Sequence, residues 1–382
     1  SSSSSSSSSE SRAGLSSGWH TLLVEDFEPI ERRFFVRLAG ALSAPNANLK
    51  AEPSALLLSL HGQYTSADEY RRDRDFGARA GVRDRVLVVY PHGMDDGNSG
   101  TGWNCGIGGN SNVCLEVGVA YDCYQSCKKL SQCGRCNWST CYDDRLFVDK
   151  LIDWVGQHVC LDLHRVYLQG ESNGGMMAHY LSTELPGRFA AVVPFYGLPL
   201  VGYGAGNAVQ LLREADSLRK TAFLTFHGRQ DRLIPLSGGI SSEGWVYEPL
   251  DKVHQMWAAV HGCNTSLVDV ADLPSPSASL DATAVRCEEY PGCSSGRRVM
   301  RCLYDGHHGN WPREGVGEEL TFWFVTQFSR EARSPNSFSK AYVPIEGVPA
   351  YNRRSLFVLV GGWCAVLILV SACCCLLFGC GL

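Results

Sequence analysis

One serine in this sequence is placed as a catalytic nucleophile would be. Ser172 lies in a Gly-x-Ser-x-Gly run, Gly170 to Gly174, that follows the apolar stretch 164–169 and precedes a helical pattern over 173–184. A tight turn between a strand and a helix lifts such a serine above the edge of a sheet, and the flanking glycines are a steric requirement. The spacing therefore predicts nucleophilic catalysis through Ser172.

The same five-residue pattern occurs again around Ser294, from Gly292 to Gly296. With 40 glycines in 382 residues, the pattern Gly-x-Ser-x-Gly has a probability of about one half of occurring somewhere by chance. The second match lies between two strand-like stretches, and no helical pattern follows it. We interpret it as a hairpin turn, so the flanking sequence favours Ser172 as the nucleophile.

A serine nucleophile needs a base to take its proton and an acid to orient that base. In one common arrangement the acid and then the histidine follow the serine along the chain. Asp231 comes a few residues after the apolar stretch 221–226, where the acid is expected. The late segment 304–312 contains two adjacent histidines, and we favour His308 over His307 as the base.

Two backbone amides are candidates for stabilising the oxyanion that forms during acyl transfer. The first belongs to Asn173, which follows the nucleophile, and the second to Gln63, in the His-Gly-Gln run that ends an apolar stretch. This chemistry needs neither a metal nor a cofactor, and we predict none.

Apolar stretches alternate with helical patterns along most of the chain. This alternation predicts an α/β fold with a mostly parallel central sheet flanked by helices. In such sheets the active site lies at the carboxyl ends of the strands, where the candidate residues fall. The expected strands are 33–38, 55–60, 85–90, 164–169, 190–195, 221–226, 285–289 and 298–303, and the expected helices are 66–80, 145–159, 173–184, 250–260 and 314–328.

Cysteine is the most informative part of the composition. Of 17 cysteines, twelve lie in the body of the chain, and seven of these fall in a Gly- and Asn-rich insertion over 105–141. An even dozen predicts disulfides and an oxidising compartment, which also suits the glycosylation sequons at Asn137 and Asn264. A zinc site built on Cys133 and Cys136 is the alternative. Disulfide stapling of the insertion is favoured, because no histidine lies at ligand spacing.

The chain divides into four predicted segments: a disordered Ser-rich stretch over 1–18, a catalytic domain over 19–330, a linker over 331–354 and a hydrophobic helix over 355–378. Residues 355–382 contain no charged residue. This uncharged stretch is long enough for a transmembrane helix, and it also fits a signal for lipid anchoring. Arginines before this stretch would place the body in the cytosol. The body cysteines argue for an extracellular or lumenal domain, which we prefer. The net charge of −5 and the scattered basic residues exclude a nucleic-acid-binding stripe.

Six segments in order resemble the polyhydroxybutyrate depolymerase and feruloyl esterase group of α/β hydrolases: LLLSLHGQYTSADEY, YPHGMDDGNSGTGWN, HRVYLQGESNGGMMAHYLSTELPGRFAAVVPFYG, FHGRQDRLIP, WAAVHGCN and YDGHHGNWP. The resemblance spans about residues 30–328. It implies an α/β-hydrolase fold and a carboxylic ester hydrolase with Ser172, Asp231 and His308 as its triad. The group usually ends in Gly-Gly-His-x-Trp-Pro, whereas His308 here lies three residues before Trp311.

Two functions therefore fit the sequence. The first is a membrane-anchored serine esterase that works outside the cytosol through an acyl-enzyme intermediate, on a small or polymeric ester. The second is a catalytically silent binding or adhesion module on the same scaffold, since a fold does not fix a function. The two differ in whether His307 or His308 can reach the Ser172 hydroxyl.

Overall fold

The computed structural model describes residues 15–79, 84–96, 100–106, 114, 123–134, 139–274, 285–312 and 315–330. These residues belong to one compact unit, Ser1–Glu331. The predicted linker 331–354 and hydrophobic helix 355–378 lie outside the described residues. Within the described ranges, no helix combines the length and apolar character that crossing a bilayer requires.

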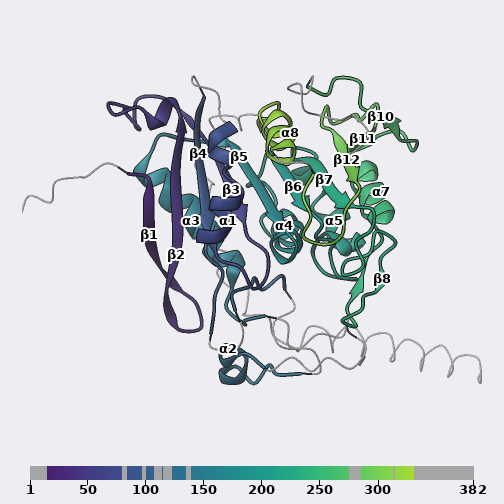
Figure 1. The fold of residues 1–382 in the computed structure, drawn as a ribbon, viewed down its shortest axis with the longest axis horizontal. Helices are drawn as coiled ribbons and strands as arrows, with labels where there is room; N and C mark the ends of the chain where they lie inside the picture. The colour runs from purple at the N-terminus through teal and green to yellow at the C-terminus, as the bar shows by residue number, and fades with distance from the viewer. Residues whose placement is uncertain are drawn as a thin grey trace, which may run out of the picture. The chain divides into compact units, whose positions relative to one another are not determined.

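The described residues form a ten-stranded sheet, and Figure 1 shows its strands side by side, from purple β1 and β2 at one edge to green β11 and β10 at the other. The middle strands, from β4 to β12, are parallel, while β1, β2, β11 and β10 pair antiparallel at the edges. The predicted mostly parallel sheet is thus confirmed in its centre. In spatial order the strands are β1 (Gly18–Glu25), β2 (Pro29–Gly40), β4 (Arg85–Pro91), β3 (Ser54–Leu60), β5 (Leu161–Glu171), β6 (Ala191–Phe195), β7 (Ala222–Gly228), β12 (Val299–Tyr304), β11 (Val285–Tyr290) and β10 (Val268–Asp269).

Helices cover both faces of this sheet. The α-helices are α1 (Ala67–Asp73), α2 (Gln125–Lys129), α3 (Asp144–His158), α4 (Asn173–Glu184), α5 (Ala208–Arg213), α6 (Ala215–Leu218), α7 (Leu250–His261) and α8 (Val316–Val325). One apolar core packs α3, α4, α5 and α7 on one face, and a second packs α1 and α8 on the other. The central strands are apolar on both sides for this reason, and every residue of β3 is buried.

Short elements complete the fold. A separate two-stranded ribbon pairs β8 (Gly239–Ile240) with β9 (Val246–Tyr247). The 3₁₀ helices are η1 (Ala41–Ser43), η2 (Phe76–Arg79) and η3 (Gly204–Gly206).

The N-terminal edge differs from the prediction. Leu15 is buried, Ser17 accepts a hydrogen bond from the backbone N–H of Leu38, and β1 begins at Gly18. The last residues of the stretch predicted to be disordered, 15–18, therefore belong to the fold. Strand β1 was not predicted because Leu23, an apolar residue on its exposed face, interrupts the alternation of polar and apolar residues that marks a strand.

Disulfides connect four cysteines of the insertion and four in the C-terminal part of the sheet, whereas Cys105 and Cys160, which the even count would have paired, are free thiols. The pairs are Cys123–Cys133, Cys127–Cys141, Cys263–Cys293 and Cys287–Cys302. The predicted disulfide framework is confirmed at these positions. The alternative zinc site included the Cys133 sulfur, which is instead bonded to Cys123, while Cys136 lies outside the described residues.

Candidate active site

Ser172 occupies the sharp turn between β5 and α4. Its backbone has φ 51° and ψ −119°, a positive-φ conformation that costs a non-glycine residue about 1–3 kcal/mol. The two motif glycines are required for close packing. A Cβ atom on Gly170 would lie 2.2 Å from the backbone oxygen of Gly174, and one on Gly174 would lie 2.4 Å from that of His61. The turn thus has the geometry that the sequence motif predicts.

Three predicted residues from distant parts of the chain meet at this turn. The Ser172 Oγ lies 2.9 Å from His308 Nε2, and His308 Nδ1 lies 2.8 Å from Asp231 Oδ2. Ser172 follows β5, Asp231 follows β7 and His308 follows β12, so all three lie at the carboxyl ends of parallel strands. His307, the alternative base, is exposed and its Nδ1 lies 3.1 Å from the backbone oxygen of Gln230 instead.

Asp231 is held in one orientation by its own loop. Its Oδ1 accepts hydrogen bonds from the backbone N–H groups of Leu233 and Ile234, at 2.9 and 2.8 Å. Burial acts to raise the pKa of this carboxyl, but the nearby His227 ring, 3.5 Å away, and the hydrogen bond with His308 outweigh it and hold the pKa below its usual value. Asp231 is therefore a carboxylate at neutral pH, the state that can orient and stabilise a protonated histidine.

The predicted oxyanion amides come from two segments that touch each other. Asn173 is the first residue of α4, where a backbone N–H has no partner within the helix. A Cβ atom on Gly62 would lie 3.4 Å from the Ser172 Cβ, which places the loop carrying Gln63 beside the nucleophile. The segments that carry both N–H groups thus lie beside the serine, where an oxyanion hole would need them.

Trp103 fixes these two segments to each other, and sequence reasoning missed it. Its indole N–H donates to the backbone oxygen of His61 at 2.8 Å. The Asn173 side chain accepts from the Trp103 N–H at 2.7 Å and donates to the Trp103 oxygen at 3.2 Å. The signal available in the sequence was a lone tryptophan in a glycine-rich stretch close after the Pro-His-Gly that ends β4.

Glu171, directly before the nucleophile, was also missed. Its Oε2 accepts hydrogen bonds from Tyr196 and from the Trp311 indole, at 2.5 and 2.7 Å. Burial raises the pKa of this carboxyl, and the two hydrogen bonds oppose that rise. An acidic residue between the apolar run Val166–Leu168 and the nucleophile was the signal that could have found it.

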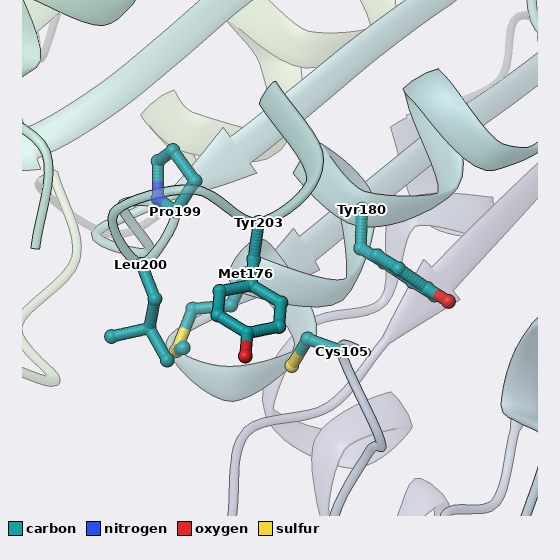
Figure 2. A pocket seen from close by; sticks show the side chains of 6 residues that line it. All are labelled: Cys105, Met176, Tyr180, Pro199, Leu200 and Tyr203. Carbon is teal, nitrogen blue, oxygen red and sulfur yellow. The ribbon is translucent and has the colours of Figure 1, made fainter. Parts of the chain in front are cut away.

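A small apolar recess lies one helical turn from the nucleophile. Figure 2 shows the residues that line it: Met176 and Tyr180 of α4, Cys105, and Pro199, Leu200 and Tyr203 of one loop. Met176 is hydrogen-bonded through its backbone N–H to the Ser172 oxygen, at 2.9 Å. The free volume of the recess, about 10 Å³, has room for about one water molecule.

The second serine motif is a turn, as predicted. It joins β11 to β12, which pair antiparallel, and Ser294 Oγ donates to the backbone oxygen of His261 at 3.1 Å. Its neighbour Cys293 is bonded to Cys263. The motif is thus part of the packing against α7.

Sequence comparison identifies relatives of the chain. A feruloyl esterase B from Piromyces equi is 24% identical over 290 residues, which cover 73% of this chain and 43% of that protein. A probable feruloyl esterase C from Aspergillus terreus is 30% identical over 178 residues, or 47% of this chain and 54% of that protein. This chain is a sequence relative of the feruloyl esterases. The predicted resemblance to the feruloyl esterase group is confirmed.

The alignments cover only part of the feruloyl esterases. The chain spans about half the length of the curated relatives it matches. No family model matches it. Among solved structures, an acetyl xylan esterase from Aspergillus awamori aligns with 80% of this chain and 99% of that chain, at 13% identity and a TM-score of 0.46.

Proposed function

We propose that this protein is a serine carboxylic ester hydrolase. The observation that carries the proposal is the continuous hydrogen-bonded series from the Ser172 hydroxyl through His308 to Asp231. A nucleophile, a base and an acid that orients the base are what acyl transfer to serine requires. The sequence relation to feruloyl esterases supports the same reaction class.

In the proposed reaction, Ser172 Oγ attacks the ester carbonyl carbon while His308 Nε2 takes the hydroxyl proton. The negative charge moves to the carbonyl oxygen, which the N–H groups of Asn173 and Gln63 stabilise. Asp231 stabilises the protonated imidazole. His308 then gives its proton to the leaving alcohol and an acyl-enzyme remains. Water, activated by His308, releases the acid and restores Ser172.

The relatives' names make feruloyl esters the first substrates to test. The disulfides support an oxidising compartment, so we place the domain outside the cytosol. Anchoring through residues 355–378 remains part of the proposal on the strength of their uncharged sequence.

A silent binding module was the competing function. It requires that neither His307 nor His308 reach the nucleophile. The 2.9 Å separation of His308 Nε2 and Ser172 Oγ favours the hydrolase instead.

The proposal is tested by substituting the nucleophile in the full chain. Purified protein is assayed on nitrophenyl acetate, methyl ferulate, a hydroxybutyrate oligomer and a peptide amide. We expect ester hydrolysis by the natural sequence and a loss of about 10³-fold or more in Ser172→Ala. Ser294→Ala, in the turn between β11 and β12, is the matched control and should keep the full rate. Equal rates for the natural sequence and Ser172→Ala would reject the proposal.

A further inference from the structure

The carboxyl of Glu171 connects two parts of the active site that are distant in sequence. Glu171 directly precedes the nucleophile in the chain. Its Oε2 accepts hydrogen bonds from Tyr196 at 2.5 Å and from Trp311 at 2.7 Å. The Trp311 Nε1 also lies 2.8 Å from the Tyr196 hydroxyl, so the three groups form a closed triangle. One vertex of this triangle is fixed to the nucleophile turn and another to the loop after β12.

Trp311 is enclosed on several sides, so its position is well defined. Its ring stacks on Phe195 with centroids 4.1 Å apart, and the Arg74 guanidinium lies 4.4 Å from the ring centroid. A Cβ atom on Gly317 would lie 2.7 Å from the ring, which leaves no room for a side chain there. The indole N–H therefore points to Glu171 from a fixed ring.

His308 lies three residues before Trp311 in the same short loop. The loop is closed on itself: the Asn310 side chain accepts from the His307 N–H at 2.8 Å, and the Tyr304 hydroxyl donates to the Asn310 oxygen at 2.6 Å. The Tyr196 ring also meets the His308 ring edge-on, with centroids 5.1 Å apart. Of the two groups that donate to Glu171, Tyr196 thus contacts the His308 ring and Trp311 lies in the same loop as His308.

We propose that Glu171 is a positioning residue that, through Tyr196 and Trp311, sets the distance between His308 and the Ser172 hydroxyl. The inference rests on the proposed ester hydrolysis. Misplacing a catalytic group by about 1 Å costs about 10²-fold in rate. Removing the acceptor should therefore lower kcat and leave KM nearly unchanged, since Glu171 acts through His308.

The test uses four variants of the full chain. Glu171→Ala removes the acceptor, and Glu171→Gln keeps an oxygen acceptor without the charge. Trp311→Phe keeps the stacked ring and removes the N–H donor. Glu248→Gln is the matched control, a buried glutamate that pairs with Lys252 at 2.7 Å on another part of the fold. The measurements are kcat and KM on nitrophenyl acetate, the unfolding temperature, and a crystal structure of Glu171→Ala.

We expect kcat to fall about 10²-fold in Glu171→Ala and about 10-fold in Trp311→Phe, with KM within about twofold. Glu171→Gln should recover most of the rate, and Glu248→Gln should match the natural sequence. In the crystal structure, His308 Nε2 should lie beyond hydrogen-bond distance from Ser172 Oγ. A folded Glu171→Ala protein with an unchanged kcat, or with the Ser172–His308 contact intact, would overturn the inference.

The two proposals fail in different ways. If the natural sequence hydrolyses esters and Ser172→Ala does not, an unchanged kcat in Glu171→Ala rejects only the role of Glu171. If the natural sequence hydrolyses no ester, the proposed function fails, and the distance in the Glu171→Ala crystal structure still decides whether Glu171 positions His308. Should Glu171→Ala fail to fold, the kcat of Trp311→Phe decides: a rate equal to that of the natural sequence rejects the role of Glu171.

Discussion

Two adjacent histidines in the loop after β12 have different surroundings. The His308 ring lies between Ser172 and Asp231, whereas the His307 ring is exposed and faces the backbone oxygen of Gln230. Adjacent residues in a turn point in different directions, so proximity in sequence does not make the two interchangeable. The geometry supports His308 as the base.

Substituting each histidine separately checks this assignment. We expect His308→Ala to lower kcat/KM about 10⁴-fold, because the serine loses its proton acceptor. His307→Ala should stay within about threefold of the natural sequence. The measurement is hydrolysis of nitrophenyl acetate at neutral pH. Comparable losses in both variants would contradict the assignment.

At this scale the sequence was a good guide to residues in motifs and a poor one to residues that support them. The proximity of Ser172, Asp231 and His308 could be predicted because each follows an apolar strand in a known order. Trp103 and Glu171 could not, since their roles depend on partners about 40 and 140 residues away. Only the folded sheet brings those partners together.

Among the elements, β2 and α3 are joined by an ion pair that is nearly inaccessible to solvent. An Arg32 nitrogen lies 2.5 Å from Asp144 Oδ1, and both side chains are buried. Burial raises the pKa of the Asp144 carboxyl, while Arg32 and the Asn104 N–H oppose the rise. Asp144 Oδ2 accepts the Asn104 N–H at 2.7 Å, next to Trp103. The pair therefore also holds the start of the Cys-rich insertion.

Removing one partner of this ion pair should lower the stability of the fold. We expect Arg32→Ala to lower the free energy of unfolding by about 3–5 kcal/mol, because Asp144 is left buried without its partner. Arg37→Ala is the control, since it removes the exposed pair with Asp75 and should cost about 1 kcal/mol or less. Urea unfolding at neutral pH measures both. Similar costs for the two variants would show that burial of Arg32 has no special effect.

Periodicity predicted the central elements well, and α4 has the predicted bounds. The edges were less predictable. Strand β1 was missed, and the predicted helix 66–80 is a short α1 followed by the 3₁₀ helix η2. Edge strands and short helices owe their existence to tertiary partners more than to local pattern.

For the molecule as a whole, buried histidines set its response to acid. Burial is the largest cause of a lowered pKa in each of them, to about 3 in His61 and His179, to about 4 in His261, and to a lower value than usual in His254. The unfolded chain binds a proton at each histidine below about pH 6.5, whereas the folded chain does not until its own lower pKa. Stability is therefore retained above pH 6.5 and lost as the pH falls from there toward 3–4.

Each of these histidines should contribute about 1.4 kcal/mol of lost stability per pH unit within that window. The raised pKa values of Asp144 and Glu171 act in the opposite direction and offset part of the loss. We expect His179→Phe, which keeps a ring against Phe223, to reduce the slope by about 1.4 kcal/mol per pH unit between pH 5 and 4. Urea midpoints across that range are the measurement. The exposed His307→Ala is the control, and an unchanged slope in His179→Phe would refute the account.

The order of the strands along the chain also determines when during biosynthesis the proposed active site can assemble. A nascent chain emerges from its N-terminus, so β5 with Ser172 and β7 with its Asp231 loop are made before β12. Strand β12 docks in parallel on β7, a pairing between segments far apart in sequence, and such pairings form slowly. His308, the proposed base, is made only after that strand. A ribosome-bound or truncated chain ending before β12 would thus contain the proposed nucleophile and acid but not the proposed base, so the proposed ester hydrolysis would report completion of the sheet.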